Sequence, residues 1–380
     1  MRFNDIPGNA KLKTKLIQAI AENRIPHAQL FVSMEGGGNL PLALAYTQYL
    51  FCKSPQESDS CGVCEACRKV SQLAHPDLKI VFPITANKTE KVSTYKDQFA
   101  DFKDAFFENP YLSISDWVQY LGKEDKKPII NVESVSEIHR DLQYKPYEAN
   151  YNVVLVWLPE LFFHSAVPKL LKILEEPPAQ TLFLLVSNSP SDILNTILSR
   201  TQLVKLDKIE DWEMLEALTQ KHGVDIQRAT EIVNIANGNY NLAQWLINEE
   251  DNSESVNLFR EWMLAAYRTD VPALLKFADN FHTMSRDKQK TFLAYCLHLI
   301  RESLISAHQM PELNRMTSAE RSFIPKFSKF INASNANEIR NMLEKSLYYV
   351  DRNANMKIVM ANISLRLMEL IKEPVAPPAN

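Results

Sequence analysis

Four of the five cysteines lie close together and could bind a metal ion. Cys52, Cys61, Cys64 and Cys67 fall within 16 residues, whereas Cys296 stands apart and is expected to be a buried core residue. Four thiolates are the ligand set of a closed tetrahedral Zn²⁺ site, and x₂ spacings place ligands on a turn around one ion. Free or regulatory thiols are the alternative, since a disulfide is disfavoured in a reducing compartment. The pattern predicts structural zinc, with no open position for a catalytic metal.

A glycine-rich turn could bind phosphate but lacks the side chains for ATP chemistry. The strand-like run QLFV leads into SMEGGGNLP and then into a helix-like segment, an arrangement in which backbone N–H groups hold phosphates. ATP binding also needs a lysine for the phosphates and a Ser or Thr hydroxyl for Mg²⁺. After Gly36, Gly37 and Gly38 this sequence has Asn39 and Leu40 instead. We therefore expect a turn kept for folding, with no bound ATP.

The strand that should end in two adjacent acids also departs from the ATPase pattern. One such acid would hold Mg²⁺ and the other would orient the attacking water. Here VVLV continues as Trp157-Leu158-Pro159-Glu160. Glu160 lies two residues past the position of the catalytic acid, and we interpret it as a solvated or capping carboxylate. On this pattern the chain should not hydrolyse ATP by itself.

These residues are expected to lie on a doubly wound α/β domain spanning residues 1–206, with the zinc-binding insertion at 52–67. Short apolar runs predict strands of a buried parallel sheet at Gln29–Val32, Lys79–Phe82, Asn152–Leu158, Thr181–Ser187 and Thr201–Lys205. Strand signals then stop and amphipathic helical patterns follow. We expect a small helical domain at 207–252, a larger all-helical domain at 253–372 and a disordered, proline-rich tail at 373–380.

The composition is that of an ordinary globular protein. The 380 residues include 46% hydrophobic and 23% charged residues, with a formal net charge of −4 that does not point to nucleic acid. No apolar run approaches the ~20 residues of a membrane span, and the polar N-terminus lacks the apolar block of a secretion signal. A cytoplasmic protein without a membrane partner is expected.

Several stretches in order along the chain resemble bacterial clamp-loader subunits of the AAA+ family. They are IPHAQLFV, the cysteine cluster, HPDL, PKLLKILEEPP, NTILSRTQ and NANMKIVMANISLRL. The resemblance covers most of the chain. It implies an α/β AAA+ module of the P-loop NTPase type, with residues 207–252 as a helical lid and 253–372 as a collar that joins subunits.

The resemblance also assigns candidate site residues. Ser199 and Arg200 match the family's Ser-Arg-Cys motif, whose arginine reaches the γ-phosphate of ATP in the neighbouring subunit; the third residue here is Thr201. The ordinary alternative for Arg200 is a salt bridge at a strand edge. Ser187-Asn188 matches a polar sensor, although a strand-end cap is favoured. Asn241 stands where active relatives carry a second sensor arginine, which is a further loss.

A degenerate phosphate loop with a retained Ser-Arg motif implies a non-catalytic subunit that helps to load the sliding clamp on primed DNA. The implied partners are the gamma/tau ATPase subunits and the delta subunit, with indirect or weak clamp contact and DNA contact through the assembly. Two alternatives are an active gamma/tau-type ATPase and a zinc-bearing nucleic-acid reader. Binding of ATP, or salt-dependent binding of DNA, by the isolated chain would favour these respectively.

Three other segments have ordinary interpretations. The role of the segment 87–128 is left open by the sequence. Within it, Phe99, Phe102 and Phe106 fall on one face of a plausible helix that could dock a partner, although packing into the core is expected. His75-Pro76-Asp77 is expected to form a turn that enters the next strand. Lys169 and Lys172 lie on an expected helix, where a solvated face and contact with DNA or a neighbour are both open.

Overall fold

The computed structural model describes residues 1–85, 92–123, 126–248, 253–310, 313, 315–317, 320–351 and 354–372. The chain forms two compact units. Unit 1 comprises Met1–Ala217 and Gly238–Asn241, and unit 2 comprises Leu218–Asn237 and the residues from Leu242 onward. The division into three parts at residues 206 and 252 stays a prediction. The predicted disordered tail at 373–380 lies outside the described residues.

Unit 1 is built on a five-stranded sheet in which every pairing is parallel. The strand order is β2-β3-β4-β1-β5. The strands are β1 (Ala28–Val32), β2 (Leu78–Val81), β3 (Asn152–Trp157), β4 (Thr181–Ser187) and β5 (Gln202–Lys205). Because the strands are parallel, the loops that follow β1, β3 and β4 emerge at one edge of the sheet, where ligands of such folds bind.

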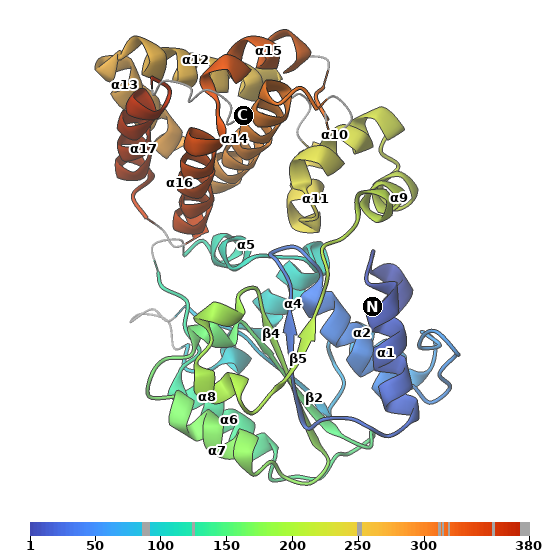
Figure 1. The fold of residues 1–380 in the computed structure, drawn as a ribbon. Helices are drawn as coiled ribbons and strands as arrows, with labels where there is room; N and C mark the ends of the chain where they lie inside the picture. The colour runs from blue at the N-terminus through green and yellow to red at the C-terminus, as the bar shows by residue number, and fades with distance from the viewer. Residues whose placement is uncertain are drawn as a thin grey trace. The chain divides into compact units, whose positions relative to one another are not determined.

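Helices cover both faces of this sheet. Figure 1 shows α1 and α2 on one side and α6 and α7 on the other. The helices are α1 (Ala10–Ala21), α2 (Asn39–Phe51), α3 (Glu65–Ser71), α4 (Phe99–Glu108), α5 (Ile114–Tyr120), α6 (Val132–Asp141), α7 (Val167–Glu175) and α8 (Asn195–Leu198). Short 3₁₀ turns are η1 (Phe3–Asp5), η2 (Tyr95–Gln98), η3 (Pro159–Leu161) and η4 (Pro190–Asp192). The layers are therefore those of a doubly wound α/β fold, as expected from the sequence.

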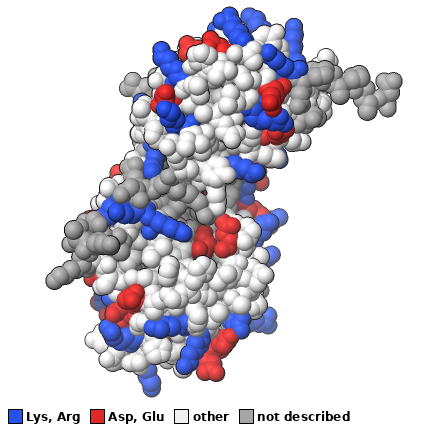
Figure 2. All heavy atoms as spheres, turned by 90° about the vertical axis from the view of Figure 1, so that its left-hand side faces the viewer, with Lys and Arg blue, Asp and Glu red and all other residues white. Residues whose placement is uncertain are grey.

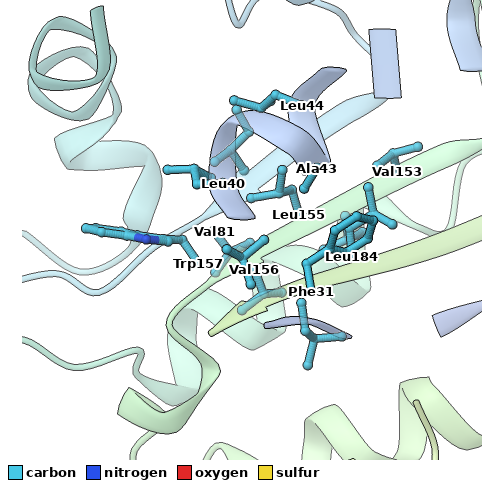
Figure 3. Close-up of a cluster of buried hydrophobic side chains, with 14 of the residues drawn as sticks. Phe31, Leu40, Ala43, Leu44, Val81, Val153, Leu155, Val156, Trp157 and Leu184 are labelled. Atoms are coloured by element: carbon cyan, nitrogen blue, oxygen red, sulfur yellow. The ribbon is translucent and has the colours of Figure 1, made fainter. Parts of the chain in front are cut away.

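One part of the core of unit 1 lies between α2 and the sheet (Figure 3). Leu40, Ala43 and Leu44 of α2 lie over Leu155 of β3 (Figure 3), and each of these side chains is 2% exposed or less. The helix follows the glycine loop directly, so burial of its apolar face fixes the position of that loop against the sheet. Removing such side chains from water contributes ~25 cal/mol per Å² of apolar area.

Unit 2 consists of helices packed on one another. Two helices span a boundary between the units: α9 (Asp211–His222) belongs to unit 2 from Leu218 onward, and α11 (Tyr240–Asn248) from Leu242 onward. The other helices are α10 (Ile226–Ala236), α12 (Ser253–Arg268), α13 (Val271–Thr283), α14 (Arg286–Ala307), α15 (Ile324–Phe327), α16 (Ala333–Asp351) and α17 (Met356–Leu370), with turns η6 (Glu320–Ser322) and η7 (Ser328–Phe330). Trp262 and Phe281 are 1% and 0% exposed. Buried aromatic side chains thus form a separate core in this unit.

Most expectations about elements are confirmed. All five expected strands are present with bounds within one residue of those expected. Cys296 is completely buried, and Phe102 and Phe106 belong to the core, with Phe99 partly buried against it. His75-Pro76-Asp77 precedes β2 directly, as expected for a turn.

The described surface carries both signs of charge. On the face drawn in Figure 2, basic and acidic side chains are interspersed, in keeping with the formal net charge of −4. Among the described residues, no helix is both long and apolar enough to cross a bilayer.

Candidate functional site

The glycine loop between β1 and α2 is a tight turn that needs its glycines. Gly36 and Gly38 have φ values of +67° and +89°, in the left-handed region that favours glycine. The N–H of Gly37 donates to the carbonyl of Met34 at 3.0 Å. A Cβ at Gly37 would lie 2.8 Å from the Cβ of Ser33, closer than van der Waals contact permits. The turn therefore has the backbone form of a phosphate-binding loop.

The two side chains that follow the loop are turned into the protein. Asn39 is 6% exposed, and its Nδ2 donates to the carbonyl of Ser187 at 2.8 Å and to Oδ1 of Asn188 at 3.1 Å. Its Oδ1 accepts the N–H of Leu40 at 2.9 Å. Leu40 is 2% exposed, in the core. Asn39 thus ties the start of α2 to the end of β4.

Residues of the chain itself pack directly on the glycine loop. The N–H of Tyr240 donates to the carbonyl of Gly36 at 3.0 Å, and a Cβ on Gly36 would lie 1.9 Å from Oδ1 of Asn239. The ring of Tyr111 lies beside Gly38, 3.2 Å from a Cβ built there. Tyr111 and Tyr240 contact each other with ring centroids 4.6 Å apart. Space next to the loop is therefore filled by protein side chains.

Asn241, expected in place of a sensor arginine, belongs to a polar network within unit 1. Its Oδ1 accepts from Asn109 Nδ2 at 2.5 Å, and its Nδ2 donates to Asp116 Oδ2 at 2.7 Å. The same Asp116 oxygen accepts the N–H of Ser113 at 2.6 Å, within the capping box that starts α5. Asn241 is 3% exposed, whereas its partners Asn109 and Asp116 are half-buried, so the network reaches from the interior toward the surface.

The expectation that Glu160 is a solvated or capping carboxylate is wrong for one of its oxygens, which is neither in water nor hydrogen-bonded within the described part of the chain. Oε2 of Glu160 is buried and has no hydrogen-bond partner among the described residues. Burial raises the pKa of Glu160 to about 7, because the charged form loses its hydration. Glu160 lies in η3, which begins directly after Leu158. The φ of +58° at Leu158 turns the chain sharply at the end of β3. That turn directs the side chain inward.

Ser187 and Asn188 serve as a cap at the end of β4. The hydroxyl of Ser187 accepts the N–H of Ser189 at 3.1 Å and donates to the carbonyl of that residue at 3.2 Å. Asn188 receives the Asn39 amide described above. These bonds match the strand-end role favoured by the sequence.

Arg200 lies just after α8 and is held by its own chain. Its Nε donates to Oε1 of Glu175 at 2.7 Å, and its Nη2 contacts the same oxygen. Its Nη1 donates to the carbonyl of Thr196 at 2.8 Å and to Oγ of Ser199 at 3.2 Å. The side chains of Arg200 and Glu175 are 33% and 49% exposed. The sequence had suggested a salt bridge only as the ordinary alternative and did not single out Glu175.

The four clustered cysteines converge as their spacing predicts. The sulfur atoms of Cys52, Cys61, Cys64 and Cys67 all lie within 4.8 Å of one another, which fits a site for one metal ion. Backbone N–H groups of Cys64 and Val63 lower the pKa of Cys61 to about 6, whereas burial raises the pKa of Cys67. Cys64 is the residue immediately before α3, and Cys67 lies within that helix.

A buried carboxylate next to the cluster was not identified from the sequence. Asp59 is 2% exposed and accepts the N–H groups of Phe3 at 3.1 Å, Asn4 at 3.0 Å and Ser60 at 2.7 Å. It anchors the cysteine loop to η1 near the N-terminus. An aspartate in a polar stretch gives no signal for partners that lie more than 50 residues away.

An open parallel sheet with a glycine loop between β1 and α2, covered by helices on both faces, defines unit 1 as an α/β domain of the P-loop NTPase type. Residues 8–210 match the family described as "DNA polymerase III, delta subunit". The match covers more than half of the chain, and the chain belongs to this family.

Characterised relatives are similar at low identity. The chain is 28% identical to DNA polymerase III subunit delta' of Escherichia coli over 189 residues, which are 50% of this chain and 45% of the relative. It is 27% identical to subunit tau of Salmonella typhimurium, over 62% of this chain and 30% of the relative. Identity to subunit delta' of Haemophilus influenzae is 25% over 79% of both chains.

A crystal structure of a DNA polymerase III gamma subunit-related protein from Thermotoga maritima is 13% identical, covering 95% of this chain and 100% of that chain. Its TM-score of 0.35 is too low for a comparison of detail. For the two relatives named first, the matched region spans less than half of the relative's length.

Proposed function

We propose that the chain is a delta-prime-type subunit of a bacterial clamp loader, which helps to load the sliding clamp on primed DNA without hydrolysing ATP itself. The observation that carries the proposal is a contrast between two positions. The phosphate loop has Asn39 and Leu40 where ATP chemistry needs lysine and a hydroxyl, while Arg200 is retained in the Ser-Arg motif. The first suits a protein without ATPase activity, and the second suits one that acts on a neighbour's ATP.

The surroundings of the glycine loop support the loss of ATP binding. Asn39 is neutral and already bonded to the end of β4, and Leu40 is buried. Asn39 has no charge to neutralise phosphate, and its Oδ1 already accepts the N–H of Leu40. Leu40 has no side-chain oxygen that could ligate Mg²⁺. Asn239 and Tyr111 pack on the glycines, next to backbone that would approach phosphate in an active relative. Occlusion of the loop by these residues and the missing positive charge both disfavour ATP binding.

The missing acids support the same proposal. β3 ends in Trp157, which is 2% exposed, followed by Leu158. Glu160 is directed inward with a pKa near 7, so at neutral pH its carboxyl group is partly protonated and a weak ligand for Mg²⁺. Asn241, bonded to Asp116, adds no cation where active relatives carry a sensor arginine. The alternative of an active gamma/tau-type ATPase would need all three functions restored.

A direct binding measurement tests this part of the proposal. Titration of the isolated chain with ATP and Mg²⁺ in a calorimeter is expected to give no binding heat. The isolated chain should likewise release no phosphate from ATP. Tight binding of Mg²⁺–ATP, or turnover by the purified chain alone, would refute the assignment as a non-catalytic subunit.

In this proposal Arg200 acts in trans as an arginine finger. A guanidinium beside the γ-phosphate stabilises the charge that develops on the transferred phosphoryl group, and such fingers contribute about 10³–10⁵ in rate in GTPases. Arginine suits this task because it is always charged and presents a rigid fork of donors. Ser199, whose hydroxyl accepts from Arg200 Nη1, orients the guanidinium.

Reconstitution of the loader tests the finger. The chain would be assembled with its cognate gamma/tau ATPase subunits, delta subunit and clamp, and DNA-stimulated ATP hydrolysis would be measured. Arg200→Ala is expected to reduce hydrolysis at the site next to this chain. Arg140→Ala is the matched control, because Arg140 makes a comparable surface ion pair with Glu137 at 2.6 Å. Unchanged hydrolysis and clamp loading with Arg200→Ala would count against the finger.

Structural zinc in the cysteine cluster is a second element of the proposal. Four sulfur atoms within 4.8 Å of one another supply a complete tetrahedral ligand set, which leaves no position for substrate. The metal would stabilise the fold of the polar segment 52–67. Metal analysis is expected to give one zinc per chain, and none for Cys64→Ser. A purified chain that is folded at residues 52–67 without bound metal would contradict this role.

The proposal also assigns roles to the remaining parts and partners. Residues 207–252 would act as the lid and 253–372 as the collar that joins the gamma/tau and delta subunits, in the cytosol. Primed DNA and the clamp would be reached through the assembled complex. Co-purification with these subunits, followed by mass measurement of the complex, tests the assembly; a chain that stays monomeric in their presence would contradict it.

A further inference from the structure

The guanidinium of Arg200 has few donors left for an external anion. A guanidinium carries five N–H groups. In the structure Nε and Nη2 are directed to Glu175, while Nη1 donates to the carbonyl of Thr196 and to the hydroxyl of Ser199. Four of the five donors are therefore used within the chain. An incoming phosphate must displace at least one of these partners to form a bidentate contact.

Glu175 is the partner whose displacement changes the charge at the site. Together, the Arg200 guanidinium and the Glu175 carboxylate have no net charge, and their direct contact offsets the attraction of the cation for phosphate. The carbonyl of Thr196 and the hydroxyl of Ser199 are neutral and leave the positive charge in place. Only the carboxylate competes with phosphate as an anion.

The position of Glu175 makes this contact exchangeable. Glu175 is the last residue of α7, where the helix dipole disfavours a carboxylate. The pair is 33% and 49% exposed, so both partners can be rehydrated when they separate. Ion pairs at such exposed positions are weak, whereas a guanidinium on a phosphate makes charge-assisted bonds.

We propose that Glu175 is a positioning residue that holds the Arg200 guanidinium on its own chain and competes for it with the phosphates of the neighbour's nucleotide. This inference rests on the proposed role of Arg200 in trans. Glu175 thereby lowers hydrolysis until the assembly brings nucleotide close enough to replace the carboxylate. The contact limits the basal rate of the loader, measured without clamp and DNA.

Removing the charge of Glu175 should therefore raise the basal rate. Glu175→Gln is expected to increase kcat of basal ATP hydrolysis by up to about fivefold, the range available from an exposed ion pair. KM for ATP should change less, since the finger acts mainly on the transition state. Glu175→Asp keeps the charge and should leave the rate closer to that of the unaltered loader. Glu176→Gln is the matched control, because Glu176 is an exposed neighbour.

The experiment uses the reconstituted loader with these variants, with Arg200→Ala and with the double variant Arg200→Ala/Glu175→Gln. In the Arg200→Ala background, Glu175→Gln should have no effect on the basal rate, which distinguishes competition for the finger from a general change of structure. If Arg200→Ala lowers stimulated hydrolysis but Glu175→Gln leaves or lowers the basal rate, the role of Glu175 is refuted and the finger stands. If Arg200→Ala has no effect, both are refuted.

Discussion

Replacement of Asp77 by asparagine should destabilise unit 1 strongly, although the two side chains have nearly the same shape. The carboxylate of Asp77 is 2% exposed. Oδ1 accepts the N–H of Tyr147 at 2.6 Å, and Oδ2 accepts those of Glu148 and Ala149 at 2.7 and 2.8 Å. These bonds join the start of β2 to the segment that leads into β3.

The expected loss follows from the bonds that asparagine cannot make. Hydrogen bonds to a charged group contribute about 1.5–3 kcal/mol each. Asparagine keeps one oxygen acceptor but turns an NH₂ group toward at least one backbone donor. We expect Asp77→Asn to lower the free energy of unfolding of unit 1 by about 2–4 kcal/mol at pH 7.

The effect should depend on pH in a defined direction. Burial tends to raise the pKa of Asp77, but the three N–H donors outweigh it and hold the pKa below its ordinary value of 3.8. A carboxyl group with a depressed folded pKa stabilises the fold above its unfolded pKa, and this stability is lost as pH falls through the folded pKa. The difference between the native chain and Asp77→Asn should be full at pH 7 and shrink below about pH 4.

Hydrogen exchange of the amides of β2 and β3 measures this loss in unit 1 alone. Asp104→Asn is the control, because Asp104 is exposed on α4. A loss below about 0.5 kcal/mol for Asp77→Asn, typical of an ordinary surface substitution, would refute the reasoning. So would a loss of the same size at pH 7 and pH 3.

Further predictions concern single contacts. Gly36→Ala should lower the free energy of unfolding of unit 1 by more than about 2 kcal/mol, because its Cβ would meet Asn239. Gly122→Ala, at a φ of +60° with open space around it, should lower it by about 1 kcal/mol. Hydrogen exchange measures both losses. Equal costs would contradict the clash. Glu320→Gln should destabilise unit 2 by about 2–4 kcal/mol in urea unfolding, because its buried carboxylate pairs with His298 at 3.1 Å. Trp117→Phe should lower the free energy of unfolding by about 1–2 kcal/mol, because the indole N–H no longer donates to the carbonyl of Pro83. An unchanged midpoint of urea unfolding would contradict this contribution of the hydrogen bond.

The elements of unit 1 could be predicted because their signals are local. Runs such as VVLVW and LFLLV are apolar on both faces, as strands buried between helix layers must be. The convergence of the cysteines followed from their spacing. Residues 36–40 indicated both the glycine turn of a phosphate loop and the absence of the lysine and hydroxyl that ATP binding needs, because loop and helix are adjacent in sequence.

Contacts between distant segments could not be predicted. Asp77 caps backbone about 70 residues away, and Glu175 meets Arg200 across 25 residues. Glu160 comes two residues after Leu158, and no residue type in this stretch indicates the positive φ of Leu158. The burial of one Glu160 carboxylate oxygen was therefore not predicted. Tyr111, within a segment whose role the sequence left open, packs on the glycine loop. Each depends on tertiary placement rather than on local pattern.

The return of Gly238–Asn241 to unit 1 has a consequence for dissecting the protein. The backbone passes from one unit to the other after residues 217, 237 and 241, so no single cut separates them. A fragment ending near residue 217 would leave the carbonyl of Gly36 without its Tyr240 donor and would deprive Asp116 of the Asn241 amide. A fragment made by simple truncation would therefore lack contacts that hold the glycine loop. An N-terminal fragment that keeps these contacts would need residues 238–241 supplied by a redesigned connection.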